Sequence, residues 1–298
     1  MFQFTALDES VLKAMGPRPA SPRDMATLER DVDSWIAELR ARRLEAASRR
    51  GFMASAHARL DALVRTDEPE YLDLRDYPAD EKVRIVQALH SLNRATLAYR
   101  RFTRVLRPYL ERVAEREGRP ARLLELASGS GEFTLALASS ASRAGLPVSI
   151  TGSDYVPEHV EKGREKARSR GLDVRFEVVD AFDMGRCEAG AWDVVFIAQS
   201  VHHFTAGQLA KMIAQSRRIA TTAFIAMDGR RSLELLLFVP GMAALTLRKS
   251  YFHDALVTAR KLFGDSELAE IARLGAPDAR VEVAHNWPGY AVLSAVWG

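Results

Sequence analysis

The feature that most constrains this chain is a turn of small residues between two apolar runs, in the stretch LLELASGSGEFTLALA, residues 123–138. Ala127, Gly129 and Gly131 stand at alternate positions, and an acid, Glu125, comes just before them. Glycine at this density weakens either a strand or a helix, so the turn indicates that something large approaches its backbone. We therefore expect a strand, an exit turn and a helix, with a polar ligand against the backbone amides and the helix N-terminus.

The composition predicts one large domain with an appendage rather than two equal domains. The chain has 298 residues, of which 47% are hydrophobic and 27% charged, so a sizeable core is available. A single cysteine, Cys187, excludes an intrachain disulfide framework and a CxxC zinc site. The first residues lack the pattern of a signal peptide, and the longest apolar run, 233–247, is shorter than the ~20 residues of a spanning helix. We expect a soluble, cytoplasmic protein with no membrane span.

The net charge of +3 belongs to the first 120 residues, which hold 22 basic and 19 acidic side chains, against 20 and 20 in the remainder. Arg100, Arg104 and Arg107 would share one helix face, and aromatic residues alternate with these cations. Such a pattern is compatible with RNA binding. Acidic residues are mixed throughout the segment, however, which favours an amphipathic helix with a solvated arginine face and disfavours a nucleic-acid partner.

Residues 22–117 have helical periodicity. The stretch 21–51 predicts a helix capped by Ser21, with Pro22 at its first position and Gly51 near its end. Its apolar residues recur at spacings of three and four: Met25, Leu28, Val32, Trp35, Ile36 and Leu39. The stretch 78–110 repeats this behaviour after an acidic loop. We expect residues 1–120 to form a helical region and residues 121–298 a separate catalytic domain.

After residue 121, short β-rich runs alternate with helical stretches. The runs are 122–126, 147–154, 174–180, 192–200, 221–228 and 291–297. This rhythm predicts βαβ units and a mostly parallel sheet with helices on both faces. Ligands bind such open sheets at the carboxyl ends of the strands, so the functional residues should be those that follow each strand.

Polar residues do follow these strands: Asp154 after the second, Asp180 after the third, and Gln199, Ser200, His202 and His203 after the fourth. Asp154 comes twenty-five residues after Gly129, where a carboxylate can accept hydrogen bonds from both ribose hydroxyls of a nucleoside. Asp180 can accept from an adenine amino group. Thr134 replaces the third glycine of a dinucleotide fingerprint, which disfavours a nicotinamide dehydrogenase.

These motifs, in this order, resemble a class I S-adenosylmethionine-dependent methyltransferase over residues 71–298. Within that family the chain is most similar to the small-molecule group, which includes quinone-pathway enzymes and enzymes encoded beside polyketide synthases. The resemblance implies an α/β, Rossmann-like, doubly wound, mostly parallel seven-stranded sheet with an N-terminal helical extension or lid. It implies S-adenosylmethionine as cofactor, bound by Glu125, Ala127, Gly129, Ser130, Gly131, Asp154, Tyr155, Asp180, Ala181, Phe182 and Gln199. Ala127 departs from the family pattern, in which glycine is commoner.

Methyl transfer from a sulfonium is an in-line displacement, so the protein mainly supplies alignment. We predict a general base at His202 or His203, because they follow the fourth strand, where the methyl group should point. Tyr99, Asp228, Arg230 and His253 are the predicted acceptor-binding residues. His253 and Asp254 are adjacent on a helix, so we expect separate contacts rather than a direct pair. No metal ligand set is predicted.

Several alternatives remain open from the sequence. An enzyme of this architecture can transfer or cyclise the aminocarboxypropyl group instead, with methylthioadenosine as product. The N-terminal helices are either a lid over the site of a small aromatic or lipophilic acceptor or a module for homodimerisation. The segment 233–247 is expected to be a bent helix pair, broken at Pro240 and Gly241, with its apolar side toward the acceptor.

Overall fold

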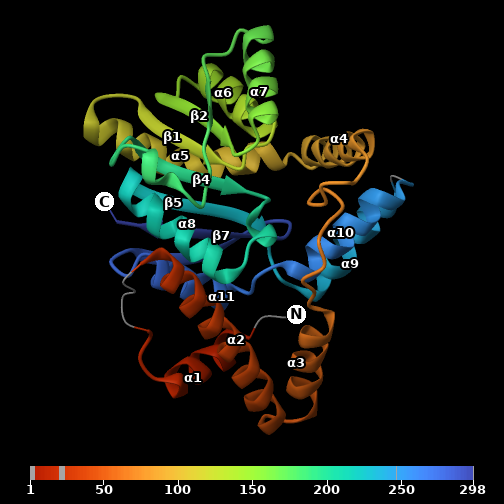
Figure 1. Cartoon of the computed structure of the whole chain (residues 1–298). Helices are drawn as coiled ribbons and strands as arrows, with labels where there is room; N and C mark the ends of the chain where they lie inside the picture. The colour runs from red at the N-terminus through yellow and green to blue at the C-terminus, as the bar shows by residue number, and fades with distance from the viewer. Residues whose placement is uncertain (1–3, 20–23, 246, 298) are drawn as a thin grey trace.

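The computed structural model describes residues 4–19, 24–245 and 247–297. Within them a seven-stranded sheet has the order β3-β2-β1-β4-β5-β7-β6 (Figure 1). The strands are β1 Ala121–Leu126, β2 Val148–Asp154, β3 Arg175–Val178, β4 Trp192–Ala198, β5 Ala220–Gly229, β6 Arg280–Asn286 and β7 Tyr290–Val296. Among these strands only β7 runs in the opposite direction to the other six. The predicted doubly wound, mostly parallel sheet is confirmed.

The strand β6 is absent from the β-rich runs read from the sequence. It lies at the edge of the sheet, paired only with β7 within the described residues. Its residues are half-buried or exposed throughout. A strand with one solvated face and one free edge needs no continuous apolar run. For this reason β6 could not be recognised from its sequence.

Helices cover both faces of the sheet and extend beyond it. They are α1 Thr5–Met15, α2 Met25–Arg49, α3 Phe52–Val64, α4 Ala79–Ala95, α5 Ala98–Glu117, α6 Glu132–Ala144, α7 Pro157–Ser169, α8 Ala206–Ile219, α9 Leu233–Ala244, α10 Lys249–Lys261 and α11 Asp265–Gly275. Helices α5, α6 and α7 pack on one face, and α8 and α11 on the other. None of the helices in the described ranges has the length and apolar character needed to cross a membrane.

Helix α2 belongs to the main core. Its side chains Val32, Ile36 and Leu39 are buried in the same apolar cluster as Val195 of β4. The predicted stripe is buried as expected, except that Met25 at its start is exposed. Ser21 and Pro22 lie outside the described residues, and the helix is capped instead by Asp24, whose side chain accepts a hydrogen bond from Thr27 N. Gly51 follows the end of the helix, as expected.

Two helical predictions need correction. The stretch 78–110 forms two helices, α4 and α5, because the backbone at Leu97 adopts a left-handed conformation with φ 56°. Conversely, α9 continues through Pro240 and Gly241 as one helix and ends at Ala244. The chain then turns before α10, so the change of direction comes after the predicted position.

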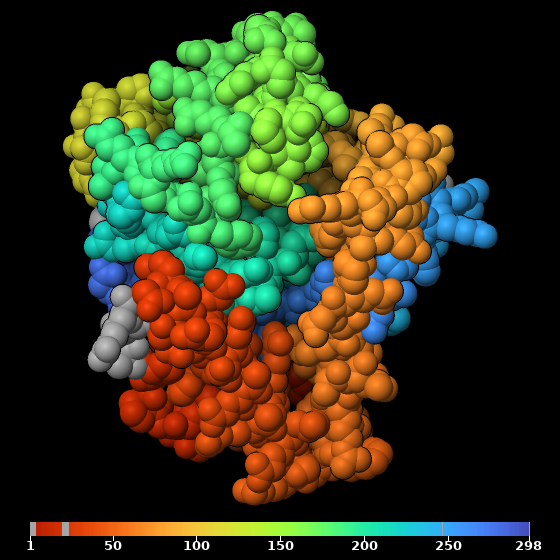
Figure 2. Space-filling view, in the orientation of Figure 1, coloured from red at the N-terminus to blue at the C-terminus, as the bar shows by residue number. Residues whose placement is uncertain are grey.

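Helices α4, α9 and α10, with the segment 65–78, lie beyond the carboxyl ends of β4 and β5 (Figure 1); we call this unit the cap. Ile85 of α4, Ala243 of α9 and Tyr251 of α10 share one small apolar cluster that holds the cap together. The segment 65–78 runs over the surface from α3 up to α4 (orange in Figure 2). The cap therefore joins the N-terminal helices to the end of the sheet where ligands bind.

Candidate cofactor and acceptor sites

The exit turn of β1 has the left-handed backbone that its small residues predict. The φ angles are 49° at Ala127, 55° at Gly129 and 78° at Gly131. A Cβ added at Gly131 would lie 2.3 Å from the Phe176 ring, whereas nothing lies within 4 Å of a Cβ added at Gly129. Gly131 is therefore required by packing inside the protein, while Gly129 faces open space that a ligand can enter.

Glu125 is buried at the end of β1, where Thr134 Oγ1 donates a hydrogen bond of 2.5 Å to its carboxyl group. Burial raises the pKa of Glu125 to about 7, against the effect of this hydrogen bond, and the nearby Asp154 raises it further. Thr134, which replaces the third glycine of the dinucleotide fingerprint, thus holds Glu125, the acid that precedes the turn.

Asp154 joins the end of β2 to the same turn. Its Oδ2 accepts a hydrogen bond of 2.9 Å from Gly129 N, and its Oδ1 accepts one of 3.0 Å from Val156 N. A carboxylate has about four acceptor positions, so capacity for ribose hydroxyls is left. Ser128 Oγ is buried in this turn without a hydrogen-bond partner among the described residues. An open approach at Gly129, an acidic acceptor and an unpaired hydroxyl together fit a nucleoside cofactor.

The other residues predicted to bind the cofactor stand at the ends of the same strands. We use the name cofactor groove for the turn 127–131, Asp154 and residues 180–182 together. Tyr155 is 73% exposed beside Asp154. Asp180 is exposed and accepts a hydrogen bond from Phe182 N, while Ala181 and Phe182 pack against the core. Ser130 accepts a hydrogen bond of 2.7 Å from Lys166 Nζ. The ends of β1, β2 and β3 bring these residues together. Their roles in cofactor binding stay predictions.

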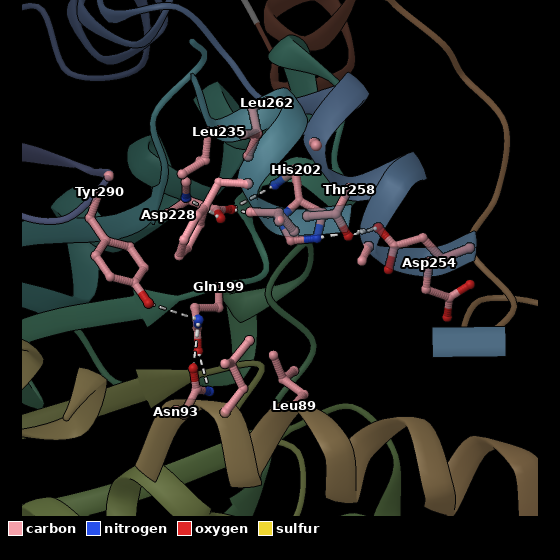
Figure 3. A pocket seen from close by; sticks show the side chains of 18 of the residues that line it. Leu89, Asn93, Gln199, His202, Asp228, Leu235, Asp254, Thr258, Leu262 and Tyr290 are labelled. Carbon is pink, nitrogen blue, oxygen red and sulfur yellow. Dashed lines mark hydrogen bonds and ion pairs between the residues drawn. The ribbon is translucent and has the colours of Figure 1, made fainter. Parts of the chain in front are cut away.

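Gln199 lines a cavity under the cap (Figure 3). It follows β4 with a left-handed φ of 53°. Its side chain accepts a hydrogen bond of 2.7 Å from Asn93 Nδ2 and donates one of 3.1 Å to Asn93 Oδ1. It also lies 3.4 Å from the hydroxyl of Tyr290. The sequence did not indicate Asn93 or Tyr290 as site residues.

The cavity is mostly apolar and has a few convergent polar groups, as small-molecule sites do. Its apolar lining comes from α4, α9, α10 and the chain that follows α10, and includes Leu89, Leu92, Leu235, Val239, Ala255 and Leu262. Its polar lining includes Asn93, Gln199, His202, Asp228, Thr258 and Tyr290. We identify it as the candidate acceptor site, because it opens beyond the strand ends that carry the cofactor groove.

His202 is buried in the wall of this cavity, between two carboxylates. Asp228 Oδ2 accepts hydrogen bonds from the backbone N of His202, at 3.0 Å, and from its Nδ1, at 2.8 Å. On the other side, His202 Nε2 is 3.4 Å from Glu70 Oε1. Burial alone would lower the pKa of His202, but Asp228 and Glu70 together raise it to about 10. A protonated ring has no lone pair, so the environment of His202 does not suit the predicted role of general base.

His203 is less buried and faces a different acid. Its Nδ1 is 3.1 Å from Asp73 Oδ1, and its Nε2 is 3.9 Å from Glu70 Oε2. Of the two histidines, His203 is the one to which the predicted role of base still applies. Glu70 and Asp73 come from the segment 65–78, which the sequence predicted only as an acidic loop.

Three predicted acceptor-binding residues do not line the described cavity. The Tyr99 hydroxyl is 2.7 Å from His90 Nδ1, and Arg230 forms a 3.3 Å ion pair with Asp265. His253 stacks on Tyr71 with ring centroids 3.8 Å apart. The expectation of separate contacts for His253 and Asp254 is wrong, because His253 Nδ1 lies 3.1 Å from Asp254 Oδ1. Asp228, by contrast, does line the cavity.

The N-terminal helices take two different positions relative to the cavity. Residues from 70 to 96 line it, whereas α1, α2 and α3 contribute none of its described lining. Buried ion pairs hold these three helices instead. Arg43 of α2 pairs with Asp8 of α1 and Glu267 of α11, and Asp61 of α3 pairs with Arg231, which lies between β5 and α9. A lid, as predicted for region 1–120, would therefore consist of residues 70–96.

The comparison with known families supports the interpretation of the groove. Residues 123–222 match the family model described as a methyltransferase domain. This segment runs from β1 into β5 and contains the turn, Asp154, Asp180 and the two histidines. The match and the fold agree with the resemblance of the motifs to class I S-adenosylmethionine-dependent methyltransferases.

The chain is 34% identical to a demethylmenaquinone methyltransferase of Thermus thermophilus over 113 residues, or 36% of this chain and 49% of that protein. It is 32% identical to a demethylmenaquinone methyltransferase of Deinococcus radiodurans over 139 residues, or 46% and 52% of the two chains. The chain thus spans about half the length of these curated relatives. Among solved structures, the plantazolicin methyltransferase BamL aligns with a TM-score of 0.54 and 12% identity, covering 80% of this chain and 98% of that one. At this identity the likeness concerns the fold alone.

Proposed function

We propose that this chain transfers a methyl group from S-adenosylmethionine to a small aromatic or lipophilic acceptor. The observation that carries the proposal is the position of the groove next to the cavity, at the carboxyl ends of adjacent strands. The groove contains the turn of β1 and Asp154, and the cavity begins at Gln199, directly after the neighbouring β4. The matched relatives, which are named demethylmenaquinone methyltransferases, support the same class of acceptor.

Each part of the site has a separate task in this proposal. S-adenosylmethionine, when bound, supplies an electrophilic methyl group. Asp154 would hold its ribose hydroxyls, Asp180 its adenine amino group, and the amides of the glycine turn its methionine part. The apolar walls from α4, α9 and α10 would bind the body of the acceptor and exclude water, while Asn93, Gln199 and Tyr290 would orient its polar end.

Product analysis tests the proposal. The purified protein is incubated with S-adenosylmethionine and a small-molecule extract of the organism that makes it, and both products are identified by mass spectrometry. We expect S-adenosylhomocysteine, together with a compound that has gained one CH₂ unit. Methylthioadenosine as the only cofactor product would show that another carbon is attacked, and it would overturn methyl transfer. A reaction without extract controls for breakdown of the cofactor.

A further inference from the structure

Glu70, His202 and His203 bring three metal-ligating groups together in the wall of the cavity. One nitrogen of each ring and one carboxylate oxygen lie within 4.8 Å of one another. His202 Nε2 is 3.4 Å from Glu70 Oε1, which exceeds a charge-assisted hydrogen bond of about 2.7–2.9 Å. The edge of a tetrahedron with metal–ligand bonds of about 2.0–2.1 Å measures roughly 3.3 Å, so this spacing suits two ligands of one ion.

Each of these three groups is held by a partner of its own. His202 Nδ1 is 2.8 Å from Asp228, and His203 Nδ1 is 3.1 Å from Asp73. The Nε2 atoms of both rings are thereby directed to the same side, toward Glu70. Metal-binding histidines almost always donate their second nitrogen to a carboxylate, a carbonyl or water in this way. Thr258 Oγ1 donates a hydrogen bond of 2.7 Å to Glu70 Oε1 and fixes the third group.

The charge around the two rings favours a cation between them. The carboxylates of Glu70, Asp73 and Asp228 all face the rings, and Lys261 Nζ approaches Asp73 at 3.9 Å from the outside. Glu70 is only 3% exposed. A buried, ionised carboxylate needs a positive partner, which a proton on His202 or a metal ion can each provide.

We propose that Glu70, His202 and His203 bind one divalent first-row transition-metal ion, such as Zn²⁺, with an open coordination position toward the cavity. Two imidazoles and one carboxylate suit such ions, whereas Mg²⁺ and Ca²⁺ take oxygen ligands. Three protein ligands leave one position of a tetrahedral ion free, as in catalytic zinc sites. All three residues line the cavity, so the free position is available to an acceptor.

The metal ion also defines the chemical class of the acceptor, and this part rests on the proposed function. An acceptor with a phenolic or enolic hydroxyl would bind the ion through its oxygen and release its proton to water. The ion lowers the pKa of a bound oxygen, so the acceptor would be an oxyanion before it attacks the methyl group. A histidine base is then not needed, which agrees with the placement of His202 between two acids.

Titration of the full-length, untagged protein with metal alone tests the site. After treatment with a chelator and dialysis, the protein is titrated with Zn²⁺ by calorimetry and with Co²⁺ by visible absorption. We expect one equivalent to bind, with the d–d bands of tetrahedral Co²⁺. Glu70→Gln and His203→Ala should lose this equivalent, and Asp73→Asn should weaken it about 10–100-fold. His285→Ala is the matched control, because His285 on β6 also pairs with an acid, Asp265, but lies outside the cluster.

The proposal is overturned if the wild-type protein binds no equivalent of either ion, or if Glu70→Gln binds it as tightly as wild type. Circular dichroism shows whether each variant folds, and the Co²⁺ spectrum of the wild type does not depend on any variant. Metal binding without formation of S-adenosylhomocysteine would leave the site standing and contradict the proposed function. Formation of S-adenosylhomocysteine by a protein that binds no metal would contradict the metal site and leave the proposed function standing.

Discussion

The side-chain amides of Asn93 and Gln199 exchange two hydrogen bonds, of 2.7 and 3.1 Å, across 106 positions of sequence. Asn93 is on α4 of the cap, and Gln199 is the first residue after β4. The pair joins the cap to the carboxyl end of β4 in the wall of the candidate acceptor cavity (Figure 3). Helix α4, which lines the candidate acceptor cavity, is therefore held by Gln199, the residue that follows the central strand β4.

The first prediction concerns this amide pair. Gln199→Ala leaves the buried Asn93 amide without its partner, which should lower the free energy of unfolding by about 1–3 kcal/mol. Asn93→Ala should do the same, and the double variant should cost less than the sum, with a coupling of roughly 0.5–3 kcal/mol. Urea unfolding of the four proteins measures this cycle. Gln87→Ala, on the exposed side of the same helix, is the control and should change the free energy of unfolding little. Additive effects of Gln199→Ala and Asn93→Ala would show that the pair is not coupled.

The second prediction concerns Asp154. Asp154→Ala should weaken the binding of S-adenosylmethionine by about 1.5–3 kcal/mol, or roughly 10- to 150-fold, because charge-assisted hydrogen bonds to the ribose are lost. Calorimetry measures the affinity, and the exposed Asp173→Ala is the control. A folded Asp154→Ala variant with wild-type affinity would refute the assignment of the groove.

Gly129 and Gly131 should respond differently to the same substitution. Gly131→Ala places a Cβ 2.3 Å from the Phe176 ring, so it should cost about 1–3 kcal/mol of overpacking beyond the ~1–2 kcal/mol of a left-handed alanine. Gly129→Ala meets open space and should cost only the backbone part, yet it should weaken cofactor binding. Urea unfolding and calorimetry on both variants separate the two effects. Equal losses of stability would contradict the packing around Phe176.

The fourth prediction concerns pH. Burial raises the pKa of Glu125 to about 7, above an unfolded value of about 4.3, so the native state binds this proton more tightly. The stabilisation from Glu125 is complete below the unfolded pKa, and it is lost as the pH rises through about 7. The difference in unfolding free energy between wild type and Glu125→Gln should therefore change between pH 4 and about 8, to the disadvantage of the wild type at high pH. A constant difference across this range would show that Glu125 titrates normally.

Six of the seven strands and the turn after β1 could be predicted from the sequence, because they arise from local patterns. Buried parallel strands are continuous apolar runs, and the turn after β1 is recognisable from the left-handed positions that its small residues occupy. Asp154 ends β2 and Asp180 follows the end of β3, so the topology alone brings them to the same edge. The positions of these residues could be predicted without knowledge of distant contacts.

The cap was not predictable in the same way. Glu70 reaches His202 from the segment 65–78, and Asn93 reaches Gln199 from α4, because both segments lie over the strand ends. The direction of α4 depends on a break at Leu97, which has a left-handed backbone without glycine or proline. Tyr99 follows that break, and its hydroxyl lies 2.7 Å from His90 Nδ1 instead of reaching the cavity. Contacts between segments so far apart are decided by packing and are not visible in either segment alone.

The most direct test of the account asks whether cofactor and acceptor occupy adjoining but separate sites. Leu89→Trp on α4 should fill the acceptor cavity, which Leu89 lines, while Val83→Trp on the exposed side of the same helix should not. The measurement is transfer of a labelled methyl group from S-adenosylmethionine to the acceptor, alongside the cofactor affinity of each variant. The expected result is that Leu89→Trp loses transfer and keeps its cofactor affinity, and that Val83→Trp keeps both. Full transfer by a folded Leu89→Trp protein would contradict it.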